Sequence, residues 1–186
     1  MIKNISNLGD AAVYCDFGIE VNRNINSEVI KYFKVIKEKN IEGINNITPS
    51  YNKLIISFDL SVTNYSKVKN QIEKLDINEV QNNSNKKLEI PVCCDTSFSL
   101  DIERLEKKLD LSKEKILENF FNKEYFCYMT GFIAGMPFLG DLDQNMRAQR
   151  LETPRVKVPK GSVGLTEQFT NIYTCLLYTS PSPRDY

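Results

Sequence analysis

Hydrophobic and polar positions alternate in short runs along the first half of the chain, and the period of the alternation changes from run to run. Residues 11–18 (AAVYCDFG) and 53–60 (KLIISFDL) are rich in branched and aromatic side chains and predict strands, and residues 44–49 predict an extended segment. Apolar side chains recur at helical spacing in residues 26–40 and 64–75. These two segments therefore predict amphipathic helices.

A further strand is predicted at residues 88–94 (LEIPVCC), directly after the polar segment 81–87 (QNNSNKK). The predicted order strand, helix, strand, strand, helix, strand is typical of a ferredoxin-like sandwich. We therefore predict a first domain over residues 1–86, with the polar segment as its boundary. The strand after that boundary can pair with either half.

The second half begins with two predicted helices, over residues 102–109 and 112–120, and then changes character. From Tyr125 onward short apolar runs are broken by Gly and Pro, which is typical of a β-barrel or sandwich. The few residues that remain supply only a thin core and exposed strand edges. We therefore predict an incomplete β-domain over residues 87–174.

Composition narrows the classes of function. The 24 basic and 24 acidic side chains cancel, so no charged stripe indicates a nucleic-acid partner or an anionic membrane surface. No apolar run reaches the length of a membrane span, and the N-terminus lacks a signal-peptide core. We expect a cytoplasmic protein without a nucleic-acid or membrane partner.

The chain contains no histidine, which excludes Ser-His-Asp and Cys-His catalysis and histidine metal ligands. The 5 cysteines are irregularly spaced and predict buried thiols rather than a disulfide framework. No bound metal is predicted. Catalysis would have to rely on carboxylates, Lys, Arg, hydroxyls, thiols and backbone amides, or on another subunit.

The segment 131–164 is the richest in Gly, Pro and Arg. Within it, KGSVG (160–164) suits an anion site, because amides near Gly161 and the Ser162 hydroxyl are hydrogen-bond donors. Arg150 or Arg155 would add a charged, forked donor. The alternative is a set of β-turns whose arginines form ordinary ion pairs.

The motifs GFIAGMPFLG (131–140), PR (154–155), VPKGSV (158–163) and FTNIYT (169–174) resemble those of the B-subunit family of prokaryotic 5-oxoprolinase. This family is also described as the kinase-A-inhibitor or allophanate hydrolase subunit 1 family. The order of the motifs is the same. The chain departs from the family pattern at several places: Ala134, Met136, Phe120, Glu167, Phe169 and Asn171.

The resemblance implies an N-terminal α/β domain and a C-terminal cyclophilin-like β-barrel. Together with the pattern above, it predicts an α+β fold, with a ferredoxin-like β-α-β-β-α-β domain followed by an incomplete cyclophilin-like β-barrel. It also implies a protein that acts with the larger, homologous C subunit and with the A subunit of 5-oxoprolinase. Together they would use ATP, with Mg²⁺, to activate 5-oxoproline for ring opening to L-glutamate. The chain alone is expected to be inactive.

The chemistry of this reaction, which needs cationic or amide donors for the phosphate, leads us to nominate particular residues. Arg150, Arg155, Gly161 and Ser162 would hold the phosphate or a developing oxyanion. Phe132 and Phe138 would line the substrate pocket, although such aromatic residues are more often part of a core. The alternative functions are a binding module that inhibits a sporulation histidine kinase and a role in urea degradation beside an allophanate hydrolase.

The last residues, CLLYTSPSPRDY (175–186), do not continue the pattern of strands and turns. Their codons can be written so that they reproduce the transposon end and adapter of common sequencing libraries. We interpret residues 175–186 as adapter sequence, so that the resemblance is truncated after Thr174. The alternative is a Pro-rich linker.

Overall fold

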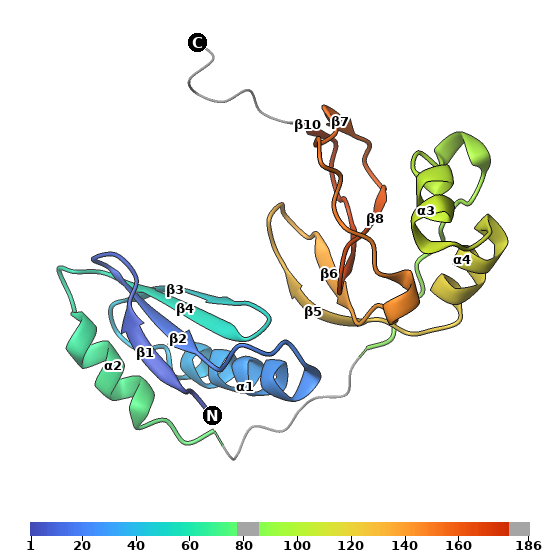
Figure 1. The fold of residues 1–186 in the computed structure, drawn as a ribbon. Coiled ribbons are helices and arrows are strands. Elements are labelled where there is room, and N and C mark those ends of the chain that lie inside the picture. The colour runs from blue at the N-terminus through green and yellow to red at the C-terminus, as the bar shows by residue number, and fades with distance from the viewer. Residues whose placement is uncertain (78–85, 179–186) are drawn as a thin grey trace, which may run out of the picture. The chain divides into compact units, whose positions relative to one another are not determined.

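The computed structural model describes residues 1–77 and 86–178 of the 186-residue chain. The chain divides into two compact units, Met1–Lys86 and Lys87–Tyr186, and each is described by itself (Figure 1). Among the described residues, no helix is both long and apolar enough to cross a membrane. Most of the predicted polar boundary, residues 81–87, lies outside the described residues.

The first unit is a four-stranded antiparallel sheet with two helices. Its elements are, in chain order, β1 (Asn4–Asn7), β2 (Ala12–Asp16), α1 (Arg23–Lys39), β3 (Ile44–Pro49), β4 (Lys53–Phe58) and α2 (Tyr65–Glu73). The strands lie side by side in the order β1-β2-β4-β3, and every pairing is antiparallel.

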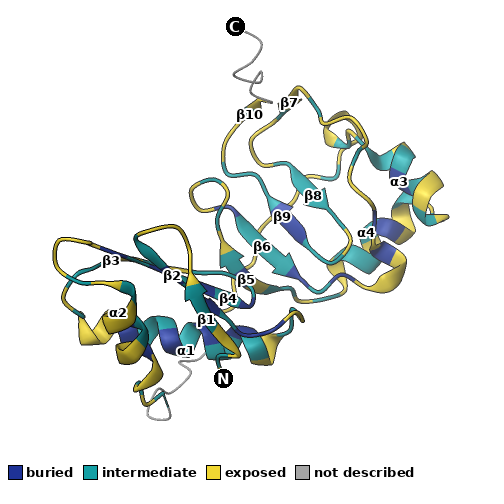
Figure 2. Cartoon of the chain, turned by 60° about the vertical axis from the view of Figure 1, so that its left-hand side comes forward, coloured by how far each residue is buried: buried dark blue, intermediate teal, exposed yellow. Residues whose placement is uncertain are grey.

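The period-two alternation places the core of the first unit on one face of this sheet. Both helices add side chains to the same cluster, so they cover the same face (Figure 2). The fully buried members are Val13, Cys15, Val29, Ile36, Leu54, Ile56, Phe58, Val68 and Ile72. Each such burial contributes roughly 1.5–3 kcal/mol relative to exposure, so this cluster is the main source of stability in the first unit.

The cysteines only partly follow the prediction of buried thiols. Cys15 lies in the core, where burial raises the pKa of its thiol to about 12. Cys93, Cys127 and Cys175 are exposed, and all five cysteines are free. The prediction of burial is therefore wrong for these three.

Helix α1 begins before the predicted start, because its cap is a different residue. The side-chain oxygen of Asn22 accepts a hydrogen bond from the N–H of Ile25 at 2.9 Å. Asn26, at the predicted start, is buried within the helix. Its Nδ2 donates to the carbonyl oxygens of Ser50 and Tyr51 at 3.1 and 2.9 Å, so this residue joins the helix to the β3–β4 turn.

The predicted strand at residues 88–94 is wrong. This segment pairs with no strand in the described chain, and Leu88 and Ile90 are 79% and 54% exposed. Pro91 has no N–H to donate to a ladder. The edge beside β2 is taken by β1, whose Ile5 lies opposite Cys15. The order is therefore β-β-α-β-β-α, and the ferredoxin-like description is not confirmed.

The second unit contains two short helices and an antiparallel sheet. Its elements are η1 (Thr96–Phe98), α3 (Ile102–Leu109), α4 (Lys113–Phe121), β5 (Phe126–Thr130), β6 (Pro137–Gly140), η2 (Gln144–Met146), β7 (Lys157–Val158), β8 (Val163–Leu165), β9 (Thr170–Ile172) and β10 (Leu177–Tyr178). The larger sheet has the order β5-β6-β9-β8, and β7 pairs with β10. The predicted helices are present.

The core of the second unit joins the helices to the turns beyond β6. It consists of Leu105, Ile116, Leu142, Met146 and Ala148. In the described residues β5 and β8 are the edges of an open sheet, so the cyclophilin-like description is not confirmed.

The start of the segment interpreted as adapter takes part in a strand pair. Leu177 lies opposite Val158 and Tyr178 lies opposite Lys157. Residues 179–186 lie outside the described residues. The boundary after Thr174 stays a prediction.

Candidate functional site

The two arginines of the predicted anion site differ in their surroundings. Arg150 is exposed and forms no hydrogen bond or ion pair within residues 1–77 and 86–178. Arg155 forms an ion pair with Asp101 at the start of α3 and donates to the carbonyl oxygen of Leu100 at 3.4 Å. In the structure Arg155 thus forms an ordinary ion pair, which was the alternative to an anion site.

The KGSVG turn uses its amides within the fold. The Gly161 N–H donates to the carbonyl oxygen of Tyr173 at 2.7 Å, and the Ser162 N–H donates to that of Pro159 at 3.2 Å. Gly161 has a φ of 85° and open space around its Cα, as expected for a turn. While these bonds persist, neither amide is available to an anion.

The predicted aromatic residues differ from each other in exposure. Phe132 is 73% exposed in the β5–β6 turn, and Phe138 is half-buried in β6 between Met129 and Asn171. That turn is attached to the end of the sheet by the Thr174 hydroxyl, which donates to the Ala134 carbonyl at 2.6 Å. The motif segments 131–140 and 169–174 therefore meet at this end of the sheet. The hydrogen bond from Gly161 to Tyr173 brings the motif segment 158–163 to the same end.

The other end of the sheet carries a polar cluster that the sequence alone does not single out. Asp141 follows the last residue of β6. The Tyr128 hydroxyl donates to its carboxylate at 3.0 and 3.2 Å, and the Gln168 Nε2 donates at 2.9 Å. We call this cluster the Asp141 corner; its members are Lys123, Tyr128, Asp141, Asp143, Arg147 and Gln168.

Glycine is required beside this corner. A Cβ on Gly140 would lie 2.8 Å from the ring of Tyr128 and 3.1 Å from that of Phe169. These two rings meet edge-on, with centroids 5.7 Å apart. The missing side chain lets both rings close over the end of β6, so Tyr128 reaches the carboxylate from β5.

Two cations lie at the same corner without contacting the Asp141 carboxylate. The Lys123 ammonium donates to the Asp141 carbonyl oxygen and to the Asp143 carboxylate, both at 2.6 Å. The Arg147 Nε donates to the Leu142 carbonyl at 3.2 Å, and Arg147 is exposed. Asp143 is thereby neutralised, whereas Asp141 forms no salt bridge within the described chain.

Phe120, which departs from the family pattern, lies close to this corner in sequence. Its carbonyl oxygen accepts from the Tyr125 hydroxyl at 3.0 Å, and the two rings are 5.1 Å apart. Burial, together with the charge of Asp143, raises the pKa of Tyr125 to about 12. Phe120 therefore serves the packing of α4.

The predicted anion turn and the Asp141 corner are at different ends of the sheet. Asp141 lies four positions after Pro137, and a strand rises about 3.3 Å per residue, so the ends are roughly 13 Å apart. One phosphoryl group cannot contact both ends. Within residues 1–77 and 86–178, no group of three acidic or cysteine side chains is placed to hold a metal ion.

The sequence contains only a weak signal for the Asp141 corner. Asp141 is the first aspartate of GDLD (140–143) and directly follows the glycine-rich motif 131–140. Tyr128 and Gln168, however, are 13 and 27 residues away from it along the chain. Their contact depends on the β5-β6-β9 register. A short bulge between Cys127 and Met129 also shifts that register, which the alternation of residues does not reveal.

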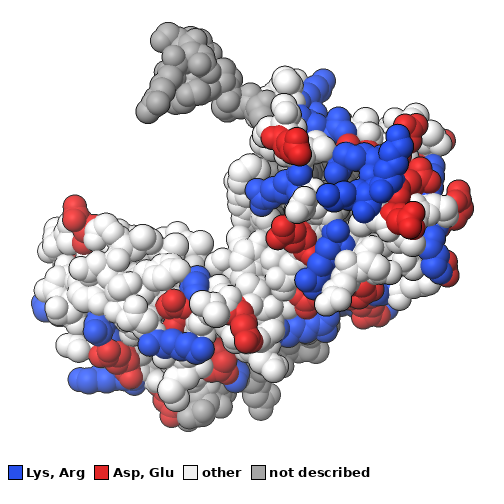
Figure 3. Space-filling model, viewed as in Figure 1, with Lys and Arg blue, Asp and Glu red and all other residues white. Residues whose placement is uncertain are grey.

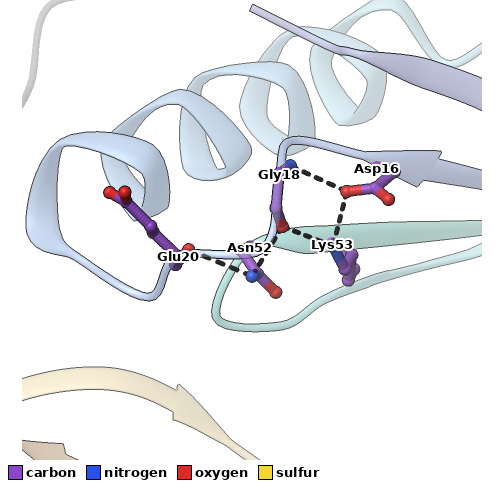
Figure 4. A network of polar contacts seen from close by, with 5 residues as sticks. All are labelled: Asp16, Gly18, Glu20, Asn52 and Lys53. Carbon is purple, nitrogen blue, oxygen red and sulfur yellow. Dashed lines mark hydrogen bonds and ion pairs between the residues drawn. The ribbon is translucent and has the colours of Figure 1, made fainter.

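A second polar network lies in the first unit and has a structural role (Figure 4). Asp16 forms an ion pair with Lys53 and accepts from the Gly18 N–H at 2.7 Å. The Gly18 carbonyl accepts from Lys53 at 2.5 Å and from Asn52 at 2.8 Å, and Asn52 also donates to the Glu20 carbonyl. This network ties the loop after β2 to the β3–β4 turn.

Charged side chains of both signs are interspersed on the visible face of each unit (Figure 3). Basic residues are concentrated in one segment, 147–160, with Arg147, Arg150, Arg155, Lys157 and Lys160 against Glu152. This segment is the most positive stretch near the predicted anion contacts.

Comparison with known proteins gives one family and several relatives. The family model of the carboxyltransferase domain, subdomain C and D, matches residues 3–181. The chain is 32% identical over 181 residues to the B subunit of 5-oxoprolinase from Bacillus subtilis (strain 168), covering 91% of this chain and 75% of that protein. The protein of the same name from Haemophilus influenzae is 38% identical over 86 residues, 46% of this chain and 40% of that protein.

Two solved structures share the fold at low sequence identity. TTHA0988 has a TM-score of 0.79 and 23% identity, over 90% of this chain and 33% of that chain. The Kluyveromyces lactis urea amidolyase has a TM-score of 0.72 and 17% identity, over 91% of this chain and 12% of that one. The chain thus spans about a third of TTHA0988.

Proposed function

Because the chain belongs to the family of the carboxyltransferase domain, subdomain C and D, we propose that it is one component of an ATP-dependent 5-oxoprolinase. The observation that carries this proposal is the 32% identity to the Bacillus subtilis B subunit over 91% of the chain. The partners are the larger C subunit and the A subunit, and the complex is cytoplasmic.

The reaction explains the need for ATP. A five-membered lactam is a poor electrophile at neutral pH, and phosphorylation of its carbonyl oxygen turns that oxygen into a leaving group. Mg²⁺ enters with ATP and neutralises its phosphates. The protein then has to hold the phosphoryl group and place the lactam beside it.

Arg150 is the best supported of the proposed phosphate contacts. It is exposed and lies in the basic segment 147–160. Arg155 must first leave Asp101, and the amides of Gly161 and Ser162 must first leave their carbonyl partners. The Ser162 hydroxyl remains a potential donor. Phe132, exposed in its turn, and Phe138 supply apolar surface for the substrate.

The experiment is release of ADP by the co-expressed complex, with and without 5-oxoproline. We expect Arg150→Ala to raise the KM for ATP at least about tenfold, a loss typical of a charged hydrogen bond. The control is Lys115→Ala, whose ion pair with Glu118 is exposed. A wild-type complex without 5-oxoproline-dependent ADP release would overturn the proposal and favour a binding role such as kinase inhibition.

A further inference from the structure

We propose that Asp141 receives the ring N–H proton of the lactam while the lactam oxygen is phosphorylated. This inference rests on the proposed function and goes beyond it, since it assigns a catalytic base. The N–H and the oxygen of a lactam share one carbon, so the inference places the lactam and its phosphoryl group at the Asp141 corner instead of at the end of the sheet that carries Phe132 and Gly161. The candidate is the carboxylate of the Asp141 corner, held by Tyr128 and Gln168.

The carboxylate has capacity for a further hydrogen bond. A carboxylate offers about four acceptor positions. The Tyr128 hydroxyl, shared between both oxygens, and the Gln168 amide occupy only part of them. Asp141 is half-buried rather than enclosed, so an N–H donor of a small ligand has access to it.

The donors that hold the Asp141 carboxylate carry no charge. Tyr128 and Gln168 are neutral, whereas Asp143 is paired with Lys123 and Asp101 with Arg155. A cation beside a carboxylate favours its charged form and weakens it as a base. Among these three aspartates of the second unit, Asp141 is the one whose carboxylate has no cation as its hydrogen-bond partner.

The surroundings of Asp141 also suit a small, partly apolar ring. The rings of Tyr128 and Phe169 close over Gly140, directly before the carboxylate. Exclusion of water on that side strengthens a hydrogen bond between the carboxylate and an amide N–H. Arg147 and Lys123, anchored at the same corner, place positive charge near the incoming phosphoryl group.

The step balances in atoms and electrons. The lactam oxygen forms a bond to the γ-phosphorus of ATP, and the bond from that phosphorus to its bridging oxygen breaks, so ADP leaves with the electron pair. The N–H electron pair becomes the second bond of C=N, the second bond of C=O breaks and its electron pair stays on the oxygen that binds phosphorus, and the proton passes to Asp141. The product is an O-phosphorylated cyclic imidate. When water later opens the ring, the protonated carboxyl can return its proton to the nitrogen.

The test is Asp141→Asn in the co-expressed complex. Asn keeps an oxygen for Tyr128 but cannot take a proton, so we expect kcat for 5-oxoproline-dependent ADP release to fall about 10²–10⁴-fold with KM changed less than about threefold. The matched control, Asp110→Asn, removes an exposed carboxylate of the second unit that lies outside the Asp141 corner, at a left-handed position (φ 53°) that Asn also adopts. We expect it to remain within about twofold of the wild type.

A second readout separates proton transfer from simple support of the fold. The corresponding lactone has a ring oxygen instead of N–H and no proton for Asp141 to take, so we expect the wild-type complex to release no ADP with it. Lactone-dependent ADP release at a rate near that with 5-oxoproline would contradict the transfer of a ring proton. Thermal melting shows whether Asp141→Asn is folded. If Asp141→Asn is unfolded, Asp141→Glu serves as the second variant, and it should keep part of the wild-type kcat because it retains a carboxylate.

Two outcomes would overturn the inference in distinguishable ways. A wild-type complex that releases ADP with 5-oxoproline, and an Asp141→Asn variant within about threefold of it, would reject Asp141 as the base and leave the proposed function standing. A wild-type complex without this activity would reject both.

Discussion

Two aspartates at strand ends show how differently one chain holds a carboxylate. Asp16 is the last residue of β2, and Asp141 directly follows β6. Asp16 contacts the Lys53 ammonium and the Gly18 N–H, whereas Asp141 contacts the neutral donors Tyr128 and Gln168. The first carboxylate is neutralised inside a network that connects two loops. The second is oriented by neutral donors and forms no salt bridge in the described part of the chain.

The two aspartates differ in the charge of their hydrogen-bond donors, and this difference separates a contact that stabilises the fold from one that orients a carboxylate. The hydrogen bond from Lys53, and then that from Gly18, lowers the pKa of Asp16, so this side chain stays charged and occupied. Neutral donors fix a carboxylate in position without supplying a counter-ion. The Asp16 network therefore stabilises the fold, whereas the Asp141 corner holds a carboxylate whose hydrogen-bond donors are neutral.

The largest expected effect is that of Gly140→Ala, which breaks the support of Asp141. The added Cβ would lie 2.8 Å from the Tyr128 ring and 3.1 Å from the Phe169 ring. We expect about 1–3 kcal/mol of destabilisation from this overpacking and displacement of the Tyr128 hydroxyl. Denaturant unfolding, with ADP release by the complex, measures both.

Gly9→Ala is the matched control, because a Cβ there meets nothing within 4 Å although its φ is 63°. It should lose about 1 kcal/mol from backbone strain alone and keep the contacts of Asp141. Equal loss of activity in the two variants would contradict a special role for Gly140.

Tyr128→Phe sharpens the comparison by removing one neutral donor. We expect about 1 kcal/mol of destabilisation, the usual value for one hydrogen bond, and a loss of kcat because Asp141 is less well oriented. Tyr125→Phe removes a hydroxyl that bonds to the Phe120 carbonyl. Tyr125→Phe should lose a similar amount of stability but keep its kcat. A loss of kcat in Tyr125→Phe and none in Tyr128→Phe would show that Tyr128 does not support the site.

Lys53→Met tests the other carboxylate. Asp16 and Lys53 are 31% and 21% exposed, so water replaces part of the lost interaction. We expect the first unit to lose about 0.7 kcal/mol, measured by amide exchange in β2 and β4. Lys87→Met, whose pair with Glu124 is 62% and 76% exposed, should change nothing. Loss of ADP release in Lys53→Met would indicate that the first network also has a chemical role.

Part of this fold follows from local patterns. β4 and α2 are predicted because their alternating or helical spacing directly marks the buried face, with Leu54, Ile56, Val68 and Ile72 in the core. β1 was missed because its four residues, NISN, carry a single apolar side chain. Residues 88–94 have the composition of a strand, but pairing depends on a neighbour, and Pro91 weakens any ladder.

The candidate site was harder to predict than the fold. Arg150 and Arg155 are similar in sequence, and only the contact with Asp101 separates them. Asp141 gives no signal that distinguishes it from Asp143, since its character depends on donors from β5 and from the turn before β9. Residue type is visible in the sequence, whereas the identity of the partner is a product of strand register.

The smallest expected effect is the dependence of the first unit on pH. The pKa of Asp16 is lower in the folded chain than its ordinary value of about 3.9. The stability from its pair is therefore fully present above that ordinary value and is lost as pH falls through the folded pKa. After a discount for exposure we expect about 0.5 kcal/mol between roughly pH 5 and 3.

The comparison of wild type with Lys53→Met isolates this contribution. Asp59, whose pKa is also lowered by its hydrogen bonds to Ser61, titrates equally in both proteins, so the difference between their amide exchange profiles belongs to Asp16. Parallel profiles would mean that the Lys53 pair adds nothing to folding. The contrast between an occupied Asp16 and an available Asp141 would then rest on geometry alone.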